Sequence, residues 1–330
     1  MNIAILDDYQ DTIRTLACFS KVAGHQVTIW RDHTKDVDVL AERLRDTEAL
    51  ALIRERTPIR GPLLRAPRQA PPHQPGRRIS AHRRRCLHAA RRHPVREPDA
   101  RPALLRHGRA DVGHDHRRRA PHPQEMAALR GGRWQAYPIG TGLRGKTLGI
   151  YGYGRIGAVV AGYGKAFGMD VVVWGRPTTM EKARADGHTL AKSREAFFSG
   201  SDVVSLHVRL VPETRGMVTA ADLALMKPSA VMVNTSRAGL IAPGALEAAL
   251  RAGRPGMAAV DVFEEEPVLG GAHPLLALDN AVCVPHLGYV ERDALEQMFT
   301  TIFNQMVAYA AGKPINVMNP DVLRQASRPA

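Results

Sequence analysis

One stretch constrains the fold of this 330-residue chain more than any other: residues 147–167, which read TLGIYGYGRIGAVVAGYGKAF. Its apolar start, residues 147–151, has the composition of a buried strand and runs directly into a cluster of glycines. Apolar residues then recur with the period of a helix; they are Ile156, Val159, Val160, Tyr163 and Phe167. A strand, a tight glycine turn and a helix in this order build the binding site for a dinucleotide pyrophosphate.

The glycine turn reads Gly152-Tyr153-Gly154-Arg155-Ile156-Gly157, a GxGxxG. Gly152 permits the tight turn, Gly154 lets the backbone approach the phosphates, and Gly157 lets the helix pack on the strand. The N–H groups at the helix start then face the phosphates. A bare GxGxxG is weak evidence, because glycine turns also occur for purely structural reasons. The flanking strand and helix favour the cofactor site, so we expect this turn to bind a dinucleotide.

Strands and helices alternate along most of the chain. The N-terminal part has strand-like runs at residues 2–6, 26–30 and 49–53, with helical patterns at 12–19 and 37–44. Further on lie a helix-like run at 126–135, strand-like runs at 147–151, 170–174, 202–208, 230–236, 257–263 and 281–284, and an amphipathic helix at 292–311. Thr219, followed by Asp222 three residues later, has the pattern of a capping box. The alternation predicts an α/β fold with parallel strands.

Composition bounds the class of protein. The cysteines at positions 18, 86 and 283 are far apart and odd in number, which argues against disulfides or a zinc site and fits a reducing compartment. The N-terminus lacks the pattern of a signal peptide, and no apolar run reaches membrane-spanning length. We therefore expect a cytoplasmic protein with no membrane partner and no bound metal.

Residues 64–123 break the pattern. They hold 16 Arg, no Lys, only four acidic residues and nine of the 23 prolines, and their apolar residues follow neither a strand nor a helix period. Their net charge of +12 accounts for almost all of the formal charge of +14, so the basic character is local. Such a segment buries too little apolar surface to offset its ordering entropy, so we expect it to be disordered.

The end of the strand-like run at 170–174 bears on the choice of cofactor. An acidic residue near this position accepts a hydrogen bond from the ribose of NAD. Here Gly175 leaves space and Arg176 offers a guanidinium that can pair with the 2′-phosphate of NADP. The pattern favours NADP slightly over NAD, and the alternative is that Arg176 is a solvated surface residue.

Three further residues follow strand-like runs: Arg237 in NTSRAG, Glu266 in DVFEEEP and His286 in VPHLG. Ligands bind at the carboxyl ends of strands in an open α/β sheet. Reduction of a carbonyl needs a proton donor, a group that orients this donor, and a cation for an adjacent carboxylate. His, Glu and Arg suit these roles, although each residue alone has a plain structural explanation.

The motifs around these residues resemble the D-isomer-specific 2-hydroxyacid dehydrogenases, in the short form of phosphoglycerate dehydrogenase-like members without a regulatory domain. They are GYGRIG at 152–157, HVRLVPETRG at 207–216, MKPSAVMVNTSRAGLI at 226–241, AAVDVFEEEP at 258–267 and VPHLGY at 284–289. The resemblance implies a Rossmann-type doubly wound parallel sheet inserted in a smaller flavodoxin-like α/β substrate domain. Residues 124–289 would form the dinucleotide-binding domain, and residues 1–123 with 290–330 the substrate domain.

The same resemblance implies roles for individual residues. Arg237 would bind the substrate carboxylate and carbonyl, His286 would be the acid/base, and Glu266 would be its partner. The implied cofactor-binding residues are Gly152, Gly154, Arg155, Ile156, Gly157, Gly175, Arg176, His207, Thr235, Ser236, Asp261 and Gly288. Among them Asp261 would hold the nicotinamide carboxamide. A homodimer is the habit of the family.

In this family, the place of residues 64–123 is taken by a strand, a substrate-gripping loop and an apolar helix that bridges the domains. The length fits but the residues do not, and a GC-rich gene read out of frame gives an Arg/Pro/Ala/His bias. We hypothesise a compensated pair of frameshifts near residues 64 and 123. Resequencing the DNA tests this hypothesis, which fails if the shifted frame does not encode an apolar helix.

The expected function is hydride transfer between NAD(P)H and a 2-keto acid or D-2-hydroxy acid, so that the partner is a small molecule. Two alternatives remain. The chain can be a catalytically impaired nucleotide-binding relative, or the Arg-rich segment can bind nucleic acid. The second is weaker, because the segment has no Lys and no aromatic residue for base stacking. A metal site at His114, Asp115, His116 and His122 is weaker still.

Overall fold

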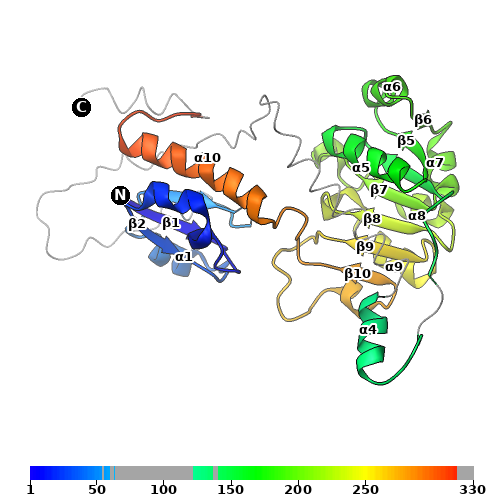
Figure 1. Ribbon diagram of the computed structural model, residues 1–330, viewed down its shortest axis with the longest axis horizontal. Coiled ribbons are helices and arrows are strands. Elements are labelled where there is room, and N and C mark those ends of the chain that lie inside the picture. The colour runs from blue at the N-terminus through cyan, green and yellow to red at the C-terminus, as the bar shows by residue number, and fades with distance from the viewer. Residues whose placement is uncertain (54–55, 60–62, 64–121, 137–139, 318–330) are drawn as a thin grey trace, which may run out of the picture. The chain divides into compact units, whose positions relative to one another are not determined.

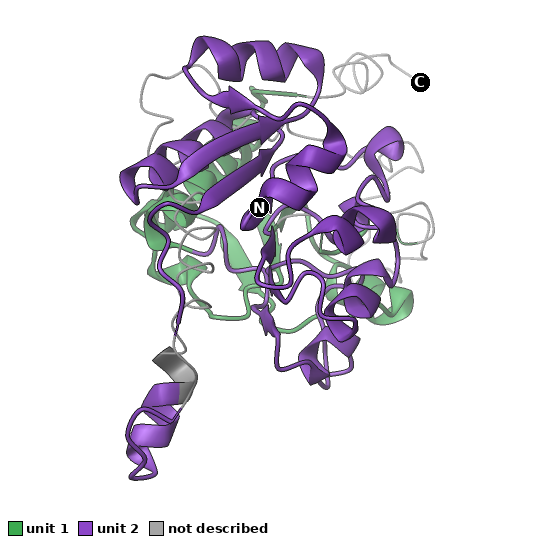
Figure 2. Cartoon of the chain, turned by 90° about the vertical axis from the view of Figure 1, so that its right-hand side faces the viewer, with its two compact units in different colours: residues 1–97, 291–330 green, residues 98–290 purple. Residues whose placement is uncertain are grey.

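The computed structural model describes residues 1–53, 56–59, 63, 122–136 and 140–317 (Figure 1). The chain divides into two compact units, Met1–Glu97 with Glu291–Ala330, and Pro98–Val290 (Figure 2). Residues 64–121, on which the expected disorder, the frameshift hypothesis and most of the alternative metal site depend, lie outside the described residues. Among the helices that are described, none has the length and apolar character that a membrane crossing requires.

The second unit is built on a parallel sheet in the order β10-β9-β8-β7-β4-β5-β6. The strands are β4 (Thr147–Tyr151), β5 (Asp170–Trp174), β6 (Thr189–Leu190), β7 (Val203–Leu206), β8 (Val231–Asn234), β9 (Met257–Val260) and β10 (Ala281–Cys283). The order reverses between β4 and β7, which is the topological switch point of a doubly wound sheet. This order confirms the predicted Rossmann-type fold.

Helices cover both faces of this sheet. They are α5 (Arg155–Ala166), α6 (Pro177–Ala185), α7 (Arg194–Gly200), α8 (Ala220–Leu225) and α9 (Ala245–Arg251). Successive residues of β7 enter different cores: Val203 packs in the core that includes Val160 of α5, and Val204 packs in the core that includes Phe197 and Leu223. Strands buried on both faces explain the continuous apolar runs in the sequence.

Helix α5 packs by a different face from the one predicted. Its buried residues are Gly157, Val160, Ala161 and Gly164, whereas Phe167 is 48% exposed. The prediction of an apolar stripe ending at Phe167 was therefore wrong in part. A Cβ added to Gly164 would lie 2.5 Å from Leu148 Cδ2, so α5 approaches β4 more closely than large side chains allow.

A capping box begins α8, as the sequence predicts. Thr219 N donates to Asp222 Oδ2 at 2.7 Å, and Asp222 N donates to Thr219 Oγ1 at 3.3 Å. The Asp222 carboxylate also accepts from Arg194, at 2.6 and 2.7 Å, and Arg194 Nη1 donates to the Tyr151 hydroxyl at 2.9 Å. Arg194 therefore ties α7 and α8 to the end of β4, a link that the sequence alone did not reveal.

The first unit contains a parallel sheet in the order β2-β1-β3. Its strands are β1 (Asn2–Leu6), β2 (Gln26–Ile29) and β3 (Ala49–Leu52), and α1 (Val37–Arg43) connects β2 with β3. The order 2-1-3 is the beginning of the flavodoxin-like arrangement. The long helix α10 (Arg292–Ala310) packs on the 3-10 helix η2 (Ala17–Val22). Glu296 of α10 accepts from Ala17 N at 2.8 Å and Cys18 N at 2.6 Å.

Two predicted helices differ from the observed ones. Residues 12–19 form no α-helix but η1 (Ile13–Thr15) and η2, separated by an extended Leu16. The Glu296 carboxylate takes the N–H groups of Ala17 and Cys18, which in a helix beginning at residue 12 would donate to carbonyl oxygens four residues earlier. Helix α4 spans His122–Arg130 rather than 126–135, because Gly132 adopts φ +75° and ends the helix.

Candidate active site

The glycine turn sits between the end of β4 and the start of α5. Gly152 has φ +96°, and a Cβ at this position would lie 2.9 Å from the carbonyl oxygen of His207. A Cβ at Gly157 would lie 2.3 Å from the carbonyl oxygen of Gly152. Around Gly154, the N-cap of α5, no atom lies within 4 Å of an added Cβ. Two glycines are thus required by the packing of the turn, and the third borders open space.

Gly175 and Arg176 follow β5. A Cβ at Gly175 would lie 2.9 Å from Thr179 Oγ1 and 3.6 Å from Gly152 N, so Gly175 backs directly onto the glycine turn. Arg176 is the N-cap of α6 and is exposed. Arg176 and the N-terminus of α6 thus directly follow a residue that borders the turn, and a guanidinium and a helix N-terminus both favour an anion.

A buried asparagine shapes the turn that carries Arg237. Asn234 Oδ1 accepts from Ser236 N at 3.1 Å, and Asn234 Nδ2 donates to Arg237 O at 3.0 Å. Ser236 Oγ donates to Val208 O at 2.8 Å, and Arg237 Nη1 donates to Ser236 O at 2.7 Å. Asn234 was not among the predicted site residues, although an Asn at the end of a strand and before a turn is a usable indication of such a bond.

The residues His286 and Glu266 lie together as predicted. His286 Nδ1 is 2.6 Å from Glu266 Oε2, and Glu266 Oε1 accepts from Phe263 N at 3.0 Å. Both side chains are partly buried. A carboxylate on Nδ1 fixes the tautomer, because Nδ1 then carries a proton and Nε2 becomes the nitrogen that exchanges one with a ligand. The pair can therefore hold an imidazole ready to act as acid or base.

The Asp261 side chain holds the turn that carries His286 through hydrogen bonds to its backbone. His286 has φ +52°, in the left-handed region that a residue other than glycine rarely adopts. The buried Asp261 carboxylate accepts from Leu287 N at 2.5 Å and from Gly288 N at 2.8 Å. Burial raises the pKa of Asp261, and these two backbone N–H groups oppose that rise. Asp261 thereby fixes the backbone on the C-terminal side of His286.

All these residues lie at the carboxyl ends of strands, in the order that the sheet sets. Arg176 follows β5 and His286 follows β10, five strand spacings away, or about 24 Å. Arg237 follows β8 and lies two spacings, about 10 Å, from the strand of His286. The glycine turn contacts His207 and Gly175, and Glu266 contacts His286. An extended ligand can therefore lie along this edge, with its anionic part at the glycine turn and its reactive part near β8 to β10.

His207 follows β7, and its imidazole cannot serve as an acid near neutral pH. Desolvation lowers the pKa of His207 to about 4 from its ordinary value of 6.5. Its backbone N–H donates to Tyr151 O at 2.8 Å, which continues the ladder between β7 and β4. The predicted cofactor role of His207 can therefore involve a neutral ring only.

We expect His207 to make the second unit sensitive to acid. The unfolded chain binds a proton to this residue at higher pH than the folded unit does, so stability is lost as the pH falls from about 6.5 to about 4. Near pH 4.5 the loss should be about 2–3 kcal/mol. Urea unfolding of wild type and His207→Gln near pH 7.5 and 4.5 measures it. An equal loss in both proteins contradicts this expectation.

Comparisons with known proteins point to one family. The sequence model of the family described as D-isomer specific 2-hydroxyacid dehydrogenase, NAD binding domain, matches residues 116–288. The chain is 42% identical over 201 residues to a glyoxylate reductase of Aeropyrum pernix, which covers 61% of this chain and 59% of that protein. It is 39% identical over 199 residues to a D-3-phosphoglycerate dehydrogenase of Methanocaldococcus jannaschii, with 60% and 38% covered. The chain thus matches less than two thirds of the length of these curated relatives.

A solved structure matches over nearly the whole length. The crystal structure of an oxidoreductase from Ralstonia solanacearum has a TM-score of 0.86 and 41% sequence identity, with 98% of each chain covered.

Proposed function

The chain belongs to the D-isomer-specific 2-hydroxyacid dehydrogenase family, and we propose that it transfers a hydride between NAD(P)H and a 2-keto acid or D-2-hydroxy acid. The observation that carries this proposal is the pair of His286 Nδ1 and Glu266 Oε2, which lie 2.6 Å apart. The pair lies at the carboxyl ends of the strands, on the same edge of the sheet as the glycine turn. A proton-transfer pair beside a dinucleotide site is what interconversion of a carbonyl and an alcohol requires.

The residues at the turn fit a dinucleotide. Gly154, as N-cap of α5, has no side chain to occupy the N–H groups of the first helical turn, and the space around it is open. Gly152, Gly154, Arg155, Ile156 and Gly157 would hold the pyrophosphate. Towards the other end, the residues that would border the nicotinamide and its ribose are His207, Thr235, Ser236, Asp261 and Gly288. When bound, NAD(P) supplies or accepts the hydride.

The protein's own residues manage the substrate and the proton. Arg237 would bind the substrate carboxylate through its guanidinium and place the carbonyl within reach. In reduction, the imidazolium of His286 gives the proton on Nε2 to the carbonyl oxygen as the hydride reaches the carbon. Glu266 keeps the proton on Nδ1 and stabilises the imidazolium before the transfer. In oxidation the neutral imidazole takes the hydroxyl proton instead.

A panel of 2-keto acids tests the proposal. The purified full chain is assayed for oxidation of NADH and NADPH with glyoxylate, hydroxypyruvate and several larger 2-keto acids. Turnover of at least one 2-keto acid supports the proposed dehydrogenase activity. If the protein binds NADPH but turns over no member of the panel, it is the catalytically impaired relative, and the proposed activity is wrong for this chain.

Arg176 should decide the choice between the two cofactors. We propose that its guanidinium pairs with the 2′-phosphate of NADP at the start of α6. Because a hydrogen bond to a charged group is worth about 1.5–3 kcal/mol, Arg176→Ala should raise the Kd for NADPH about tenfold to hundredfold and leave that for NADH almost unchanged. Arg184→Ala, on the same helix and also exposed, is the matched control. Equal Kd values for NADPH in both variants contradict the assignment.

Family membership also supports a homodimer in the cytoplasm, which we propose as the state of this chain. Helix α4 and the residues after it expose Met126, Leu129 and Trp134, the last at 78% of its surface. Exposed apolar residues gathered on one short segment are typical of an interface. Light scattering at micromolar concentration measures the mass, and a monomer would contradict the proposal.

A further inference from the structure

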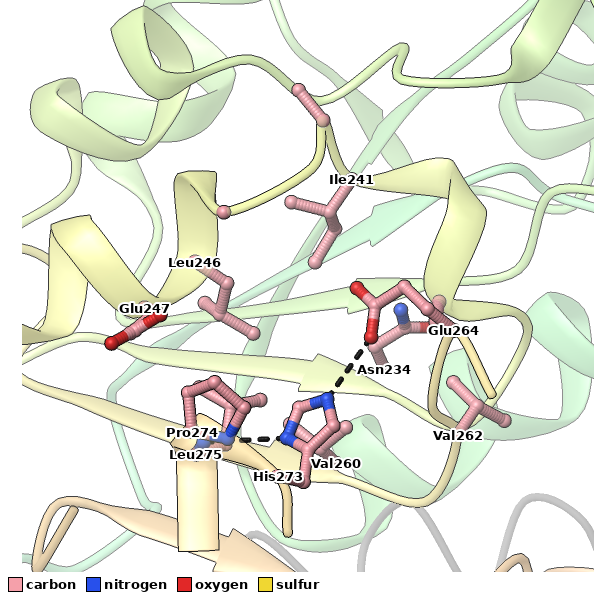
Figure 3. A pocket seen from close by; sticks show the side chains of 13 residues that line it. Asn234, Ile241, Leu246, Glu247, Val260, Val262, Glu264, His273, Pro274 and Leu275 are labelled. Carbon is pink, nitrogen blue, oxygen red and sulfur yellow. Dashed lines mark hydrogen bonds and ion pairs between the residues drawn. The ribbon is translucent and has the colours of Figure 1, made fainter. Parts of the chain in front are cut away.

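The loop that carries Glu266 is closed at its base by a second His–carboxylate pair. His273 Nε2 lies 3.0 Å from Glu264 Oε2, and the two residues bracket the loop between β9 and the 3-10 helix η7 (Pro274–Ala277) (Figure 3). We propose that Glu264 and His273 form a positioning pair, which fixes the loop backbone and thereby the Glu266 carboxylate against His286. This inference rests on the proposed function, in which Glu266 orients the acid/base.

The hydrogen bonds of His273 define its role. Its Nδ1 accepts from Leu275 N at 3.3 Å, which makes His273 the N-cap of η7. Because Nδ1 is the acceptor, Nε2 carries the ring proton and donates it to Glu264. The ring is 16% exposed, and Glu264 is 58% exposed. A ring anchored on η7 thus holds an otherwise solvent-facing glutamate.

Phe263 connects this pair with the catalytic pair. The rings of Phe263 and His273 are 4.9 Å apart and meet edge to face at 72°. The backbone N–H of Phe263 also donates to Oε1 of Glu266. The other carboxylate oxygen of Glu266, Oε2, lies 2.6 Å from His286 Nδ1. The contacts therefore run without a gap from His273 through Phe263 to Glu266 and His286.

The Glu264–His273 pair acts as a clasp at the ends of a segment with two adjacent glycines, which by themselves restrict the backbone little. Gly270 and Gly271 have φ +65° and +68°. Leu269, which precedes them in the same loop, is 67% exposed. Glycines add conformational freedom that folding must remove. A cavity of about 180 Å³ lies behind the clasp, lined by Val260, Val262 and Leu275 as well as by Glu264 and His273 (Figure 3). The pair thus lies at the wall of a cavity beside the hydrophobic core that includes Val260 and Leu275.

The cavity also borders the turn that carries Arg237, the third candidate catalytic residue. Asn234 and Ala238 line it, and the Asn234 side chain is the one that bonds the backbone of Ser236 and Arg237. The cavity therefore borders both the Glu264–His273 clasp and the Asn234 turn, and each is held by its own local hydrogen bonds.

The test uses the full chain and two variants of Glu264, one that removes the side chain's acceptor and one that keeps it. Glu264→Ala should lower kcat about tenfold with the Kd for NADPH unchanged, whereas Glu264→Gln keeps an acceptor for His273 and should stay within about twofold of wild type. His273→Asn, which retains a cap for η7 but does not reach Glu264, should match Glu264→Ala. The double variant should be no slower than either, because both remove one interaction.

A second readout separates this inference from the proposed function. The ¹⁵N resonance of His286 Nδ1, assigned by its loss in His286→Asn, reports the bond to Glu266 without any turnover. It should shift in Glu264→Ala and stay in place in Glu264→Gln. If wild type shows no turnover but the resonance shifts as expected, the proposed function fails and the clasp stands. Wild-type kcat, or an unshifted resonance, in the folded Glu264→Ala variant overturns the clasp.

Discussion

Replacing His286 by Asn should lower kcat by about a hundredfold to ten-thousandfold, the range that a positioned general acid contributes. The developing alkoxide then has no proton on Nε2 to accept and must take one from water. Asn is the suitable replacement, because it tolerates the φ of +52° at this position better than most residues. The turn held by Asp261 should therefore keep its shape, and the Kd for NADPH should change by less than about threefold.

The measurement combines initial rates with a titration of NADPH fluorescence. Glu266→Gln serves as a companion, because its amide oxygen still accepts from Nδ1 but no longer balances an imidazolium. Its kcat should fall less than that of His286→Asn. A His286→Asn enzyme with more than a tenth of wild-type kcat would remove His286 from its assigned role. Loss of NADPH binding along with turnover would mean that the substitution disturbed the fold instead.

The second large effect concerns the packing of the glycine turn. Gly157→Ala places a Cβ 2.3 Å from the Gly152 carbonyl oxygen and 3.2 Å from Ile150 Cγ2, so that α5 and the turn must move apart. Overpacking of this kind costs about 1–3 kcal/mol of stability. The phosphate-binding N–H groups belong to the two segments that separate, so the Kd for NADPH should rise at least about a hundredfold.

The same helix provides the matched control. An added Cβ at Gly162 meets nothing within 4 Å, and Gly162 lies in the interior of α5. Gly162→Ala should therefore stabilise the protein by about 0.5–1 kcal/mol and leave NADPH binding unchanged. Fluorescence titration and urea unfolding of both variants decide the matter. If Gly157→Ala binds NADPH as tightly as Gly162→Ala, the close contact between Gly157 and Gly152 does not govern the site.

The sequence was most informative where residues are buried on both sides of the large sheet. Its longer strands are continuous apolar runs, and β4 and β5 have the bounds that were predicted. The other strands predicted for this sheet, β7 to β10, end one to three residues before their predicted ends. At these ends the chain leaves the sheet to form the turns with His207, Ser236 and Asp261. Apolar residues continue beyond β7, β9 and β10, as Val208, Val262 and Val284 show, so composition cannot locate the ends of these strands. The edge strand β6 has two residues and was not predicted.

The parts of the candidate site that could not be predicted depend on bonds between distant residues. Nothing in the local pattern of Asp261 indicates that its oxygens bind the backbone of Leu287 and Gly288, 26 and 27 residues later. The helix expected at residues 12–19 failed for the same reason. The Glu296 carboxylate, 278 and 279 residues away, takes the N–H groups of Cys18 and Ala17 that a helical ladder needs.

The return of α10 to the first unit has a consequence for the order of synthesis. Helix η2 leaves the ribosome early, but α10, which covers it, follows only after about 270 further residues, or about 15–50 s at typical rates of elongation. During this interval the large sheet, which is continuous in sequence, can form, whereas Phe19 still lacks the ring of Phe303 on which it packs at 6.0 Å. The earliest part of the chain is therefore the last to be completed, and its apolar residues that pack on α10 stay uncovered until translation has almost ended.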